Sequence, residues 1–148
     1  MYPVPKIVRL TSRRVAVTAG IWCAVGSLAL AYSIQSDQLD RQKVFYGTPE
    51  KFEKPAEVDY EEVVRFTPEY QEIKKKKVER GTGRYWILLS QASDHAVRTI
   101  CKVGGDTEHD LIAARGYLAT LDPPIPATDV TDLVVESLHE ENKEKTDK

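Results

Sequence analysis

Three histidines, at positions 95, 109 and 139, are the residues of this 148-residue chain best suited to acid–base or metal chemistry. None of them has another histidine or a cysteine three or four residues away, the spacing that places two zinc ligands on one helix face. His109 stands between Glu108 and Asp110 in what we expect to be the first turn of a helix, which is a solvated position. We therefore predict no metal site.

The residue types of a hydrolytic triad occur together at Ser90, Ser93, Asp94 and His95. Near neighbours on one helix rarely adopt triad geometry, and the chain has no G-x-S-x-G turn that would expose a serine nucleophile. We therefore predict no catalytic residue, and we expect that the protein is not an enzyme.

A short glycine turn, Gly81-Thr82-Gly83, has the composition of part of a phosphate-binding loop, with Arg80 and Arg84 on either side. The dinucleotide motif fails at Trp86, which occupies the position of its third glycine, and no Gly-Lys-Ser/Thr sequence follows. The segment is typical of a turn between two helices. We predict no cofactor and no small-molecule substrate.

The four consecutive lysines 74–77, followed by Arg80, form the one dense basic patch after the first 34 residues. On a helix they point in all directions, so the simplest interpretation is a solvated helix end that complements the helix dipole. The alternative is contact with an acidic partner or with lipid head groups. Trp86 fits a buried core position better than an exposed anchor. The candidate partner-binding residues are Tyr70, Lys74, Lys75, Lys77, Arg80 and Trp86.

An uncharged apolar stretch, Val15–Ile34, supplies the strongest signal about where the protein resides. Twenty helical residues extend ~30 Å, which matches the hydrocarbon core of a bilayer. The leader 1–14 carries four basic residues and no acid, so the positive-inside rule places the N-terminus in the cytoplasm or the mitochondrial matrix. We predict a single-pass transmembrane helix.

Two other interpretations of this stretch stay open: a helix buried in a soluble fold, and a secretory signal cleaved after Ala29-Leu30-Ala31. If the stretch is an anchor, its small residues would let a second membrane helix approach closely. The small residues that we expect to pack against such a helix are Ala19, Gly20, Cys23, Ala24, Ser27 and Ala31.

Helical signals dominate the rest of the chain, which we divide into a stalk (35–58), a helical domain (59–139) and a disordered charged tail (140–148). Asp59, Thr67 and Thr82 are suited to cap helices, and Gly104-Gly105 would end the longest one. Further helices are expected from about Asp106 to Leu121 and after Asp129. The predicted fold is all-α, with a core led by Trp86, Leu89, Ile100, Leu111, Leu118 and Leu133.

Charge and architecture together suggest a function. Four of the 21 basic residues and none of the 23 acidic residues lie in the first 34 positions, so the remainder has a formal charge of −6. This balance argues against nucleic-acid binding. We expect a membrane-anchored, non-enzymatic accessory subunit or assembly factor of an inner-membrane complex, most simply a mitochondrial respiratory one, with the domain in the intermembrane space. Its partners would be the membrane and integral membrane subunits.

Two alternatives belong to other classes. One is a bacterial periplasmic or envelope binding protein whose signal peptide is removed. The other is an enzyme with a dispersed site, in which His95, His109 or Cys101 would meet other polar groups in a cleft.

Overall fold

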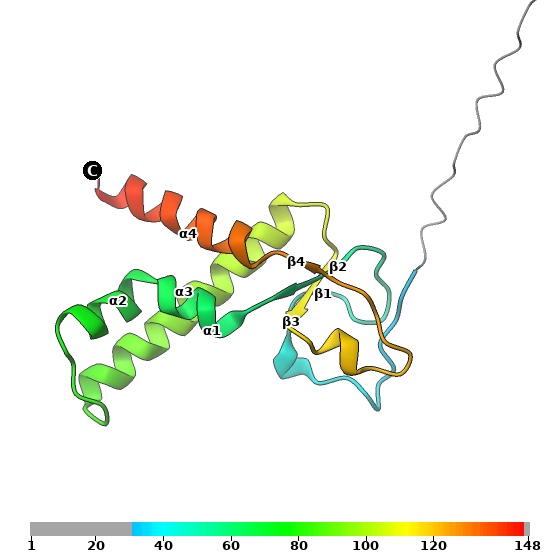
Figure 1. The fold of residues 1–148 in the computed structure, drawn as a ribbon, viewed down its shortest axis with the longest axis horizontal. Helices are drawn as coiled ribbons and strands as arrows, with labels where there is room; N and C mark the ends of the chain where they lie inside the picture. Colours follow the sequence, from blue (N-terminus) through cyan, green and yellow to red (C-terminus); the bar gives the residue numbers. More distant parts are fainter. Residues whose placement is uncertain (1–30, 147–148) are drawn as a thin grey trace, which may run out of the picture.

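A computed structural model describes residues 31–146, which form a mixed sheet with helices extending from one end of it (Figure 1). The four strands are β1 (Val44–Gly47), β2 (Pro55–Val58), β3 (Leu111–Ala114) and β4 (Thr128–Asp129). The helices are α1 (Tyr60–Phe66), α2 (Pro68–Lys75), α3 (Gly83–Asp106) and α4 (Thr131–Thr146), with short 3-10 turns at Arg41–Lys43 and Leu118–Thr120.

The strand order in the sheet is β1-β3-β2-β4. Strands β2, β3 and β4 are parallel, and β1 is antiparallel to β3 at one edge. Helices α1, α2 and α3 together make the crossover from β2 to β3, so Ala56 pairs with Ile112 across 56 positions of sequence. Both residues are fully buried, as is usual for strands in the middle of a parallel sheet.

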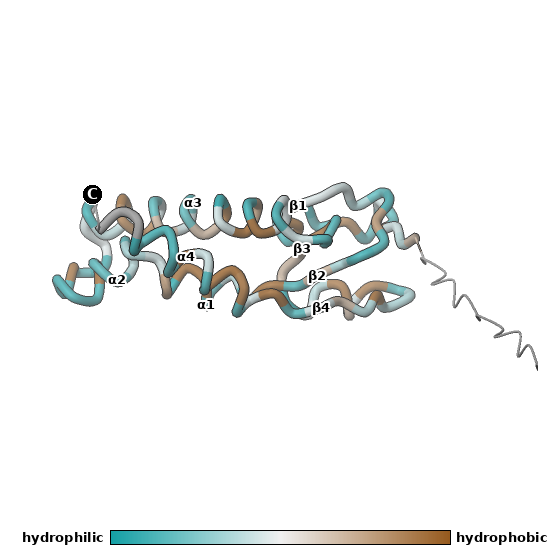
Figure 2. The backbone as a smooth tube through the Cα atoms, turned by 90° about the horizontal axis from the view of Figure 1, so that it is seen from above, coloured by the Kyte–Doolittle hydropathy of each residue, from teal (hydrophilic) through white to brown (hydrophobic). Residues whose placement is uncertain are grey.

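Helices α1, α2 and α3, which we call the helical arm, each begin at a capping residue that the sequence identifies. Asp59 caps α1 by accepting a hydrogen bond from the amide of Glu62, and Thr67 and Thr82 cap α2 and α3 in the same way. These three caps and the extent of α3 confirm the sequence prediction. Figure 2 shows α3 along one long side of the molecule and α1 along the other.

The core consists of two groups of buried side chains. The first lies among the sheet, α1, α3 and α4, and includes Val58, Val63, Ile100, Ile112 and Leu138. The second joins the segment before β1 to the region around the second 3-10 turn, and includes Ile34, Phe52, Leu111, Leu118 and Ile125. The strand β3 contributes to both groups, which explains why all of its first three residues are buried.

The prediction of an all-α fold is wrong, because the described residues contain a four-stranded sheet. Two of the strands, 44–47 and 55–58, lie in the segment predicted to be a stalk, and a third, 111–114, lies in a predicted helix. Each strand has at most four residues, too few to show a period of two. The run Leu111–Ala114 is buried on both faces, so its uniform apolarity does not distinguish a strand from a helix.

Two predicted core residues, Trp86 and Leu133, are 58% and 48% exposed. Helix α3 buries the arc that passes through Leu88, Ala92 and Ala96. At 3.6 residues per turn, Trp86 lies about 160° around the helix from Leu88, on the side away from the core. The placement of Trp86 in the core is therefore wrong, whereas Ile100, Leu111 and Leu118 are buried as expected.

Most of the predicted membrane span, residues 15–30, lies outside the described residues, as do the candidate packing residues Ala19, Gly20, Cys23, Ala24 and Ser27. The end of the stretch is described and is not helical. Tyr32 exchanges two backbone hydrogen bonds with Phe52, and Ile34 is only 6% exposed. Within residues 31–146, no helix is long and apolar enough to cross a membrane.

The C-terminal helix is longer than the sequence suggested. Helix α4 continues to Thr146, through most of the segment predicted to be a disordered tail. Its early residues Val134 and Leu138 are buried, and Glu141 contacts α3 through His95 and Lys102. These contacts with α3 stabilise the charged C-terminal part of helix α4.

Candidate functional site

The predicted partner-binding residues lie close together in the structure. Tyr70, Lys74 and Lys75 belong to α2, Lys77 and Arg80 to the turn that follows, and Trp86 to the start of α3. We call residues 70–87 the arm tip. It lies at the end of the molecule opposite the sheet and the point where residue 31 enters the fold (Figure 1).

Within the arm tip, the acidic residue Glu72 links α2 to α3. Glu72 accepts hydrogen bonds from Lys76 at 2.8 Å and from Arg84 at 3.0 Å, which joins α2 to α3. These two bonds, with that of Lys76 the larger, lower the pKa of Glu72 below its ordinary value. The basic side chains of Lys75, Lys77 and Arg80 are exposed, and no described carboxylate forms an ion pair with them.

Exposed apolar side chains accompany these free charges. Trp86 and Ile87 are 58% and 60% exposed, and the ring of Tyr85 packs edge-on against Trp86 with 5.4 Å between centroids. The Nζ of Lys74 lies 5.5 Å from the centroid of the Tyr70 ring. A shallow groove of about 700 Å³ runs along α2, lined by Pro68, Gln71, Glu72 and the lysines 74–76. The tip therefore combines positive charge with apolar surface.

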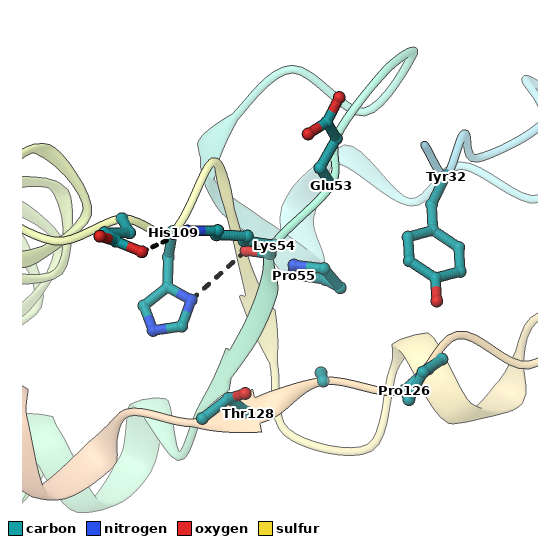
Figure 3. Close-up of a pocket in the computed structure, with 9 residues that line it drawn as sticks. Tyr32, Glu53, Lys54, Pro55, His109, Pro126 and Thr128 are labelled. Carbon is teal, nitrogen blue, oxygen red and sulfur yellow. Dashed lines mark hydrogen bonds and ion pairs between the residues drawn. The ribbon is translucent and has the colours of Figure 1, made fainter. Parts of the chain in front are cut away.

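A second hollow, of about 640 Å³, lies beside the amino ends of β2 and β4 (Figure 3). Its polar groups mainly bind one another. Lys54 forms an ion pair with Glu108, whose pKa falls because of this hydrogen bond, and His109 Nδ1 lies 3.4 Å from the carbonyl of Lys54. Tyr32 and Pro126 line the other end of the hollow. These contacts join the segment before β2 to the segment before β3.

His95, the buried histidine of α3, contacts glutamates of two other helices. His95 is 4% exposed, and its Nδ1 lies 3.0 Å from a carboxylate oxygen of Glu69 on α2. Its Nε2 lies 3.3 Å from Glu141 on α4, which also accepts a hydrogen bond from Lys102 at 3.0 Å. His95 thus connects three helices. No group of histidine, cysteine and acidic residues within 31–146 is arranged to hold a metal ion.

The three residues of the dispersed-enzyme alternative have separate partners. His95 faces the two glutamates, and His109 lines the hollow beside β2. Cys101 directs its Sγ to the carbonyl oxygen of Phe45 at 3.3 Å. Of the three, His109 lies with other polar residues, among them Lys54 and Glu108, at a hollow.

A charged cluster that the sequence did not suggest lies at the carboxyl ends of the parallel strands, where α/β folds often bind ligands. Arg115 Nη1 donates to Asp59 at 3.0 Å, and Nη2 donates to Thr131 at 3.1 Å and also forms an ion pair with Asp129. These residues follow or end β3, β2 and β4 and begin α4. The arginine is engaged in joining the strand ends, so we assign this cluster to the stability of the fold.

Two carboxylates of these clusters make stability depend on pH. Burial raises the pKa of Asp129 and of Glu141, but hydrogen bonds outweigh it, from Thr131 and Arg115 in the first case and from Lys102 and His95 in the second. Both values end below the ordinary 3.8 and 4.5. The stabilisation is therefore complete above pH 4.5 and is lost as the pH falls through the lowered values.

We expect urea unfolding midpoints, measured by circular dichroism, to fall steadily below pH 4.5. Changing Glu141 to glutamine and Asp129 to asparagine removes both titrating groups, so the double variant should lose stability less steeply with acid. A slope equal to that of the parent chain would contradict the assignment of the acid sensitivity to these two residues.

Comparison of the chain with protein-family models, with curated proteins and with solved structures finds no match.

Proposed function

We propose that this chain is a membrane-tethered, non-enzymatic binding subunit that holds the arm tip at a fixed distance from the membrane. The observation that carries the proposal is the exposed basic and aromatic tip at the end opposite residue 31. A tether raises the effective concentration of a binding surface near membrane partners. This activity needs no catalytic group.

The way in which the chain enters the fold supports a rigid arrangement. Tyr32 pairs with Phe52, their rings stack with centroids 5.9 Å apart, and the amide of Ile34 donates to the carbonyl of Pro49 at 2.8 Å. Within the described residues, the chain is therefore packed against the domain from residue 32 onward. A membrane span that ends near Ala31 would keep the sheet close to the bilayer and direct the arm away from it.

The setting that fits this proposal is that of an accessory subunit or assembly factor of a mitochondrial inner-membrane complex. The basic, acid-free leader and the uncharged stretch that follows it support this setting. The small residues of the stretch would provide a second contact, with membrane helices of the complex.

The proposal is tested with the full-length chain in its native membranes. Alkaline carbonate washing should leave the chain in the membrane pellet. A photoreactive amino acid at Ile87 should then cross-link to a stable neighbour, whereas the same group at Leu133, another exposed aliphatic position on a helix, should not. Release by the alkaline wash, or equal cross-linking from both positions, would refute the proposal.

A bacterial envelope protein with a cleaved signal is the second candidate, and one specific observation favours it. Tyr32, which exchanges two backbone hydrogen bonds with Phe52, directly follows the Ala29-Leu30-Ala31 pattern. Cleavage there would keep the packed residues that the structure describes between 32 and 146. N-terminal sequencing of the native protein decides between the two candidates, because a mature chain that starts at Tyr32 has no anchor.

A further inference from the structure

We infer that the arm tip binds an acidic, amphipathic segment of a partner protein. This inference names the partner chemistry of the tip in the proposed function and rests on that tip, but it does not require the membrane tether. Three features of the tip lead to it: the sign of its charge, its exposed apolar side chains, and the order in which the two occur along the arm.

The charge of the tip differs in sign from that of the surrounding domain. Residues 70–87 contain six basic and two acidic side chains, a formal charge of +4, whereas the chain after residue 34 carries −6 in all. The positive charge is also accessible, because Lys75, Lys77 and Arg80 are exposed and form no ion pair with a described carboxylate. An acidic ligand is therefore attracted to the tip and repelled by the rest of the domain, which orients its approach.

Charge alone does not account for the side chains beside it. Trp86 and Ile87 are adjacent and mostly exposed, at a position where a helix facing only water would carry polar residues. Tryptophan, with arginine, is among the residues that contribute most to binding at protein interfaces. A ligand that matches the whole tip must therefore offer apolar groups next to its carboxylates.

The order of residues along the arm favours a protein over a lipid surface. The connection between α2 and α3, which lies at the far end of the molecule from the sheet (Figure 1), and its flanks, residues 76–84, are polar except for Val78 and the glycines. Trp86 follows at the end of the first turn of α3. Insertion into a bilayer from this end would carry Lys77 and Arg80 into the hydrocarbon before Trp86 reached it, which is costly. A protein segment that lies against the side of the tip contacts the charges and the apolar pair together.

The test measures binding of a synthetic amphipathic peptide of glutamate and leucine to the full-length chain in a neutral detergent. The chain has two tryptophans, so the change Trp22→Phe leaves Trp86 as the only tryptophan fluorophore. We expect a saturable blue shift of Trp86 fluorescence, with an affinity that falls as salt is added. Absence of a saturable shift with the peptide would overturn the inference.

Two triple variants with the same change in net charge separate a specific site from general attraction. Reversing the tip charges, with Lys74→Glu, Lys75→Glu and Lys77→Glu, should weaken binding by about tenfold or more. Reversing three exposed bases elsewhere, with Arg41→Glu, Lys51→Glu and Lys143→Glu, should change it less than about twofold. Equal weakening by both variants would overturn the inference.

Vesicles of phosphatidylglycerol and phosphatidylcholine provide the competing ligand. Tip-dependent binding of these vesicles without binding of the peptide would identify lipid as the ligand and overturn the inference. The outcome is independent of the tether: release of the chain by an alkaline wash refutes the proposed membrane function, whereas failure of the peptide to bind refutes only the partner chemistry.

Discussion

Replacement of His95 by alanine is expected to lower the free energy of unfolding by about 2 to 4 kcal/mol, one of the two largest single-residue effects that we expect in this domain. The ring is 4% exposed and lies between the carboxylates of Glu69 and Glu141, which are themselves about one-quarter exposed. Removing it deprives two carboxylates of the ring that they both contact and opens a cavity among three helices. Urea denaturation followed by circular dichroism measures the loss.

A matched histidine and a rescue variant identify the cause. His139 lies on α4, is exposed, and its ring lies roughly perpendicular to that of Phe66, so His139→Ala should cost less than about 1 kcal/mol. Glu141 keeps its ion pair with Lys102, so in the His95→Ala background changing Glu69 to glutamine removes the charge left without a partner and should restore part of the stability. If the rescue variant has the same free energy of unfolding as His95→Ala alone, the whole loss is due to the cavity.

The parts of the fold that the sequence predicts well are those determined by near neighbours. Asp59, Thr67 and Thr82 each cap a helix through an amide three residues later, so the information lies within one turn. The strands depend on partners far away, since β2 pairs with β3 across the whole helical arm. Each strand has four residues or fewer, which is too short for the two-residue period that would identify a strand from the sequence.

The same distinction explains the candidate sites. The lysine run and Trp86 are near one another in sequence, so composition alone could nominate the arm tip, although it misplaced Trp86 in the core. Glu69 and Glu141 lie 26 and 46 positions from His95, and no local pattern connects them. Arg115 likewise joins Asp59 to Asp129 only because parallel strands place their carboxyl ends at one edge of the sheet.

The replacement Gly47→Ala is expected to destabilise the domain by about 3 kcal/mol or more. Gly47 ends β1 with a φ of +91°, and a Cβ atom there would lie 2.0 Å from the carbonyl oxygen of Asp110, immediately before β3. The clash involves backbone, so the β1–β3 pairing itself must shift. Gly81 has the same φ, but a Cβ atom there would meet no other atom within 4 Å, so Gly81→Ala measures the conformational cost alone, about 1 to 2 kcal/mol. Equal losses in urea denaturation would show that β1 adapts to the methyl group and that the close approach to Asp110 does not hold it in register.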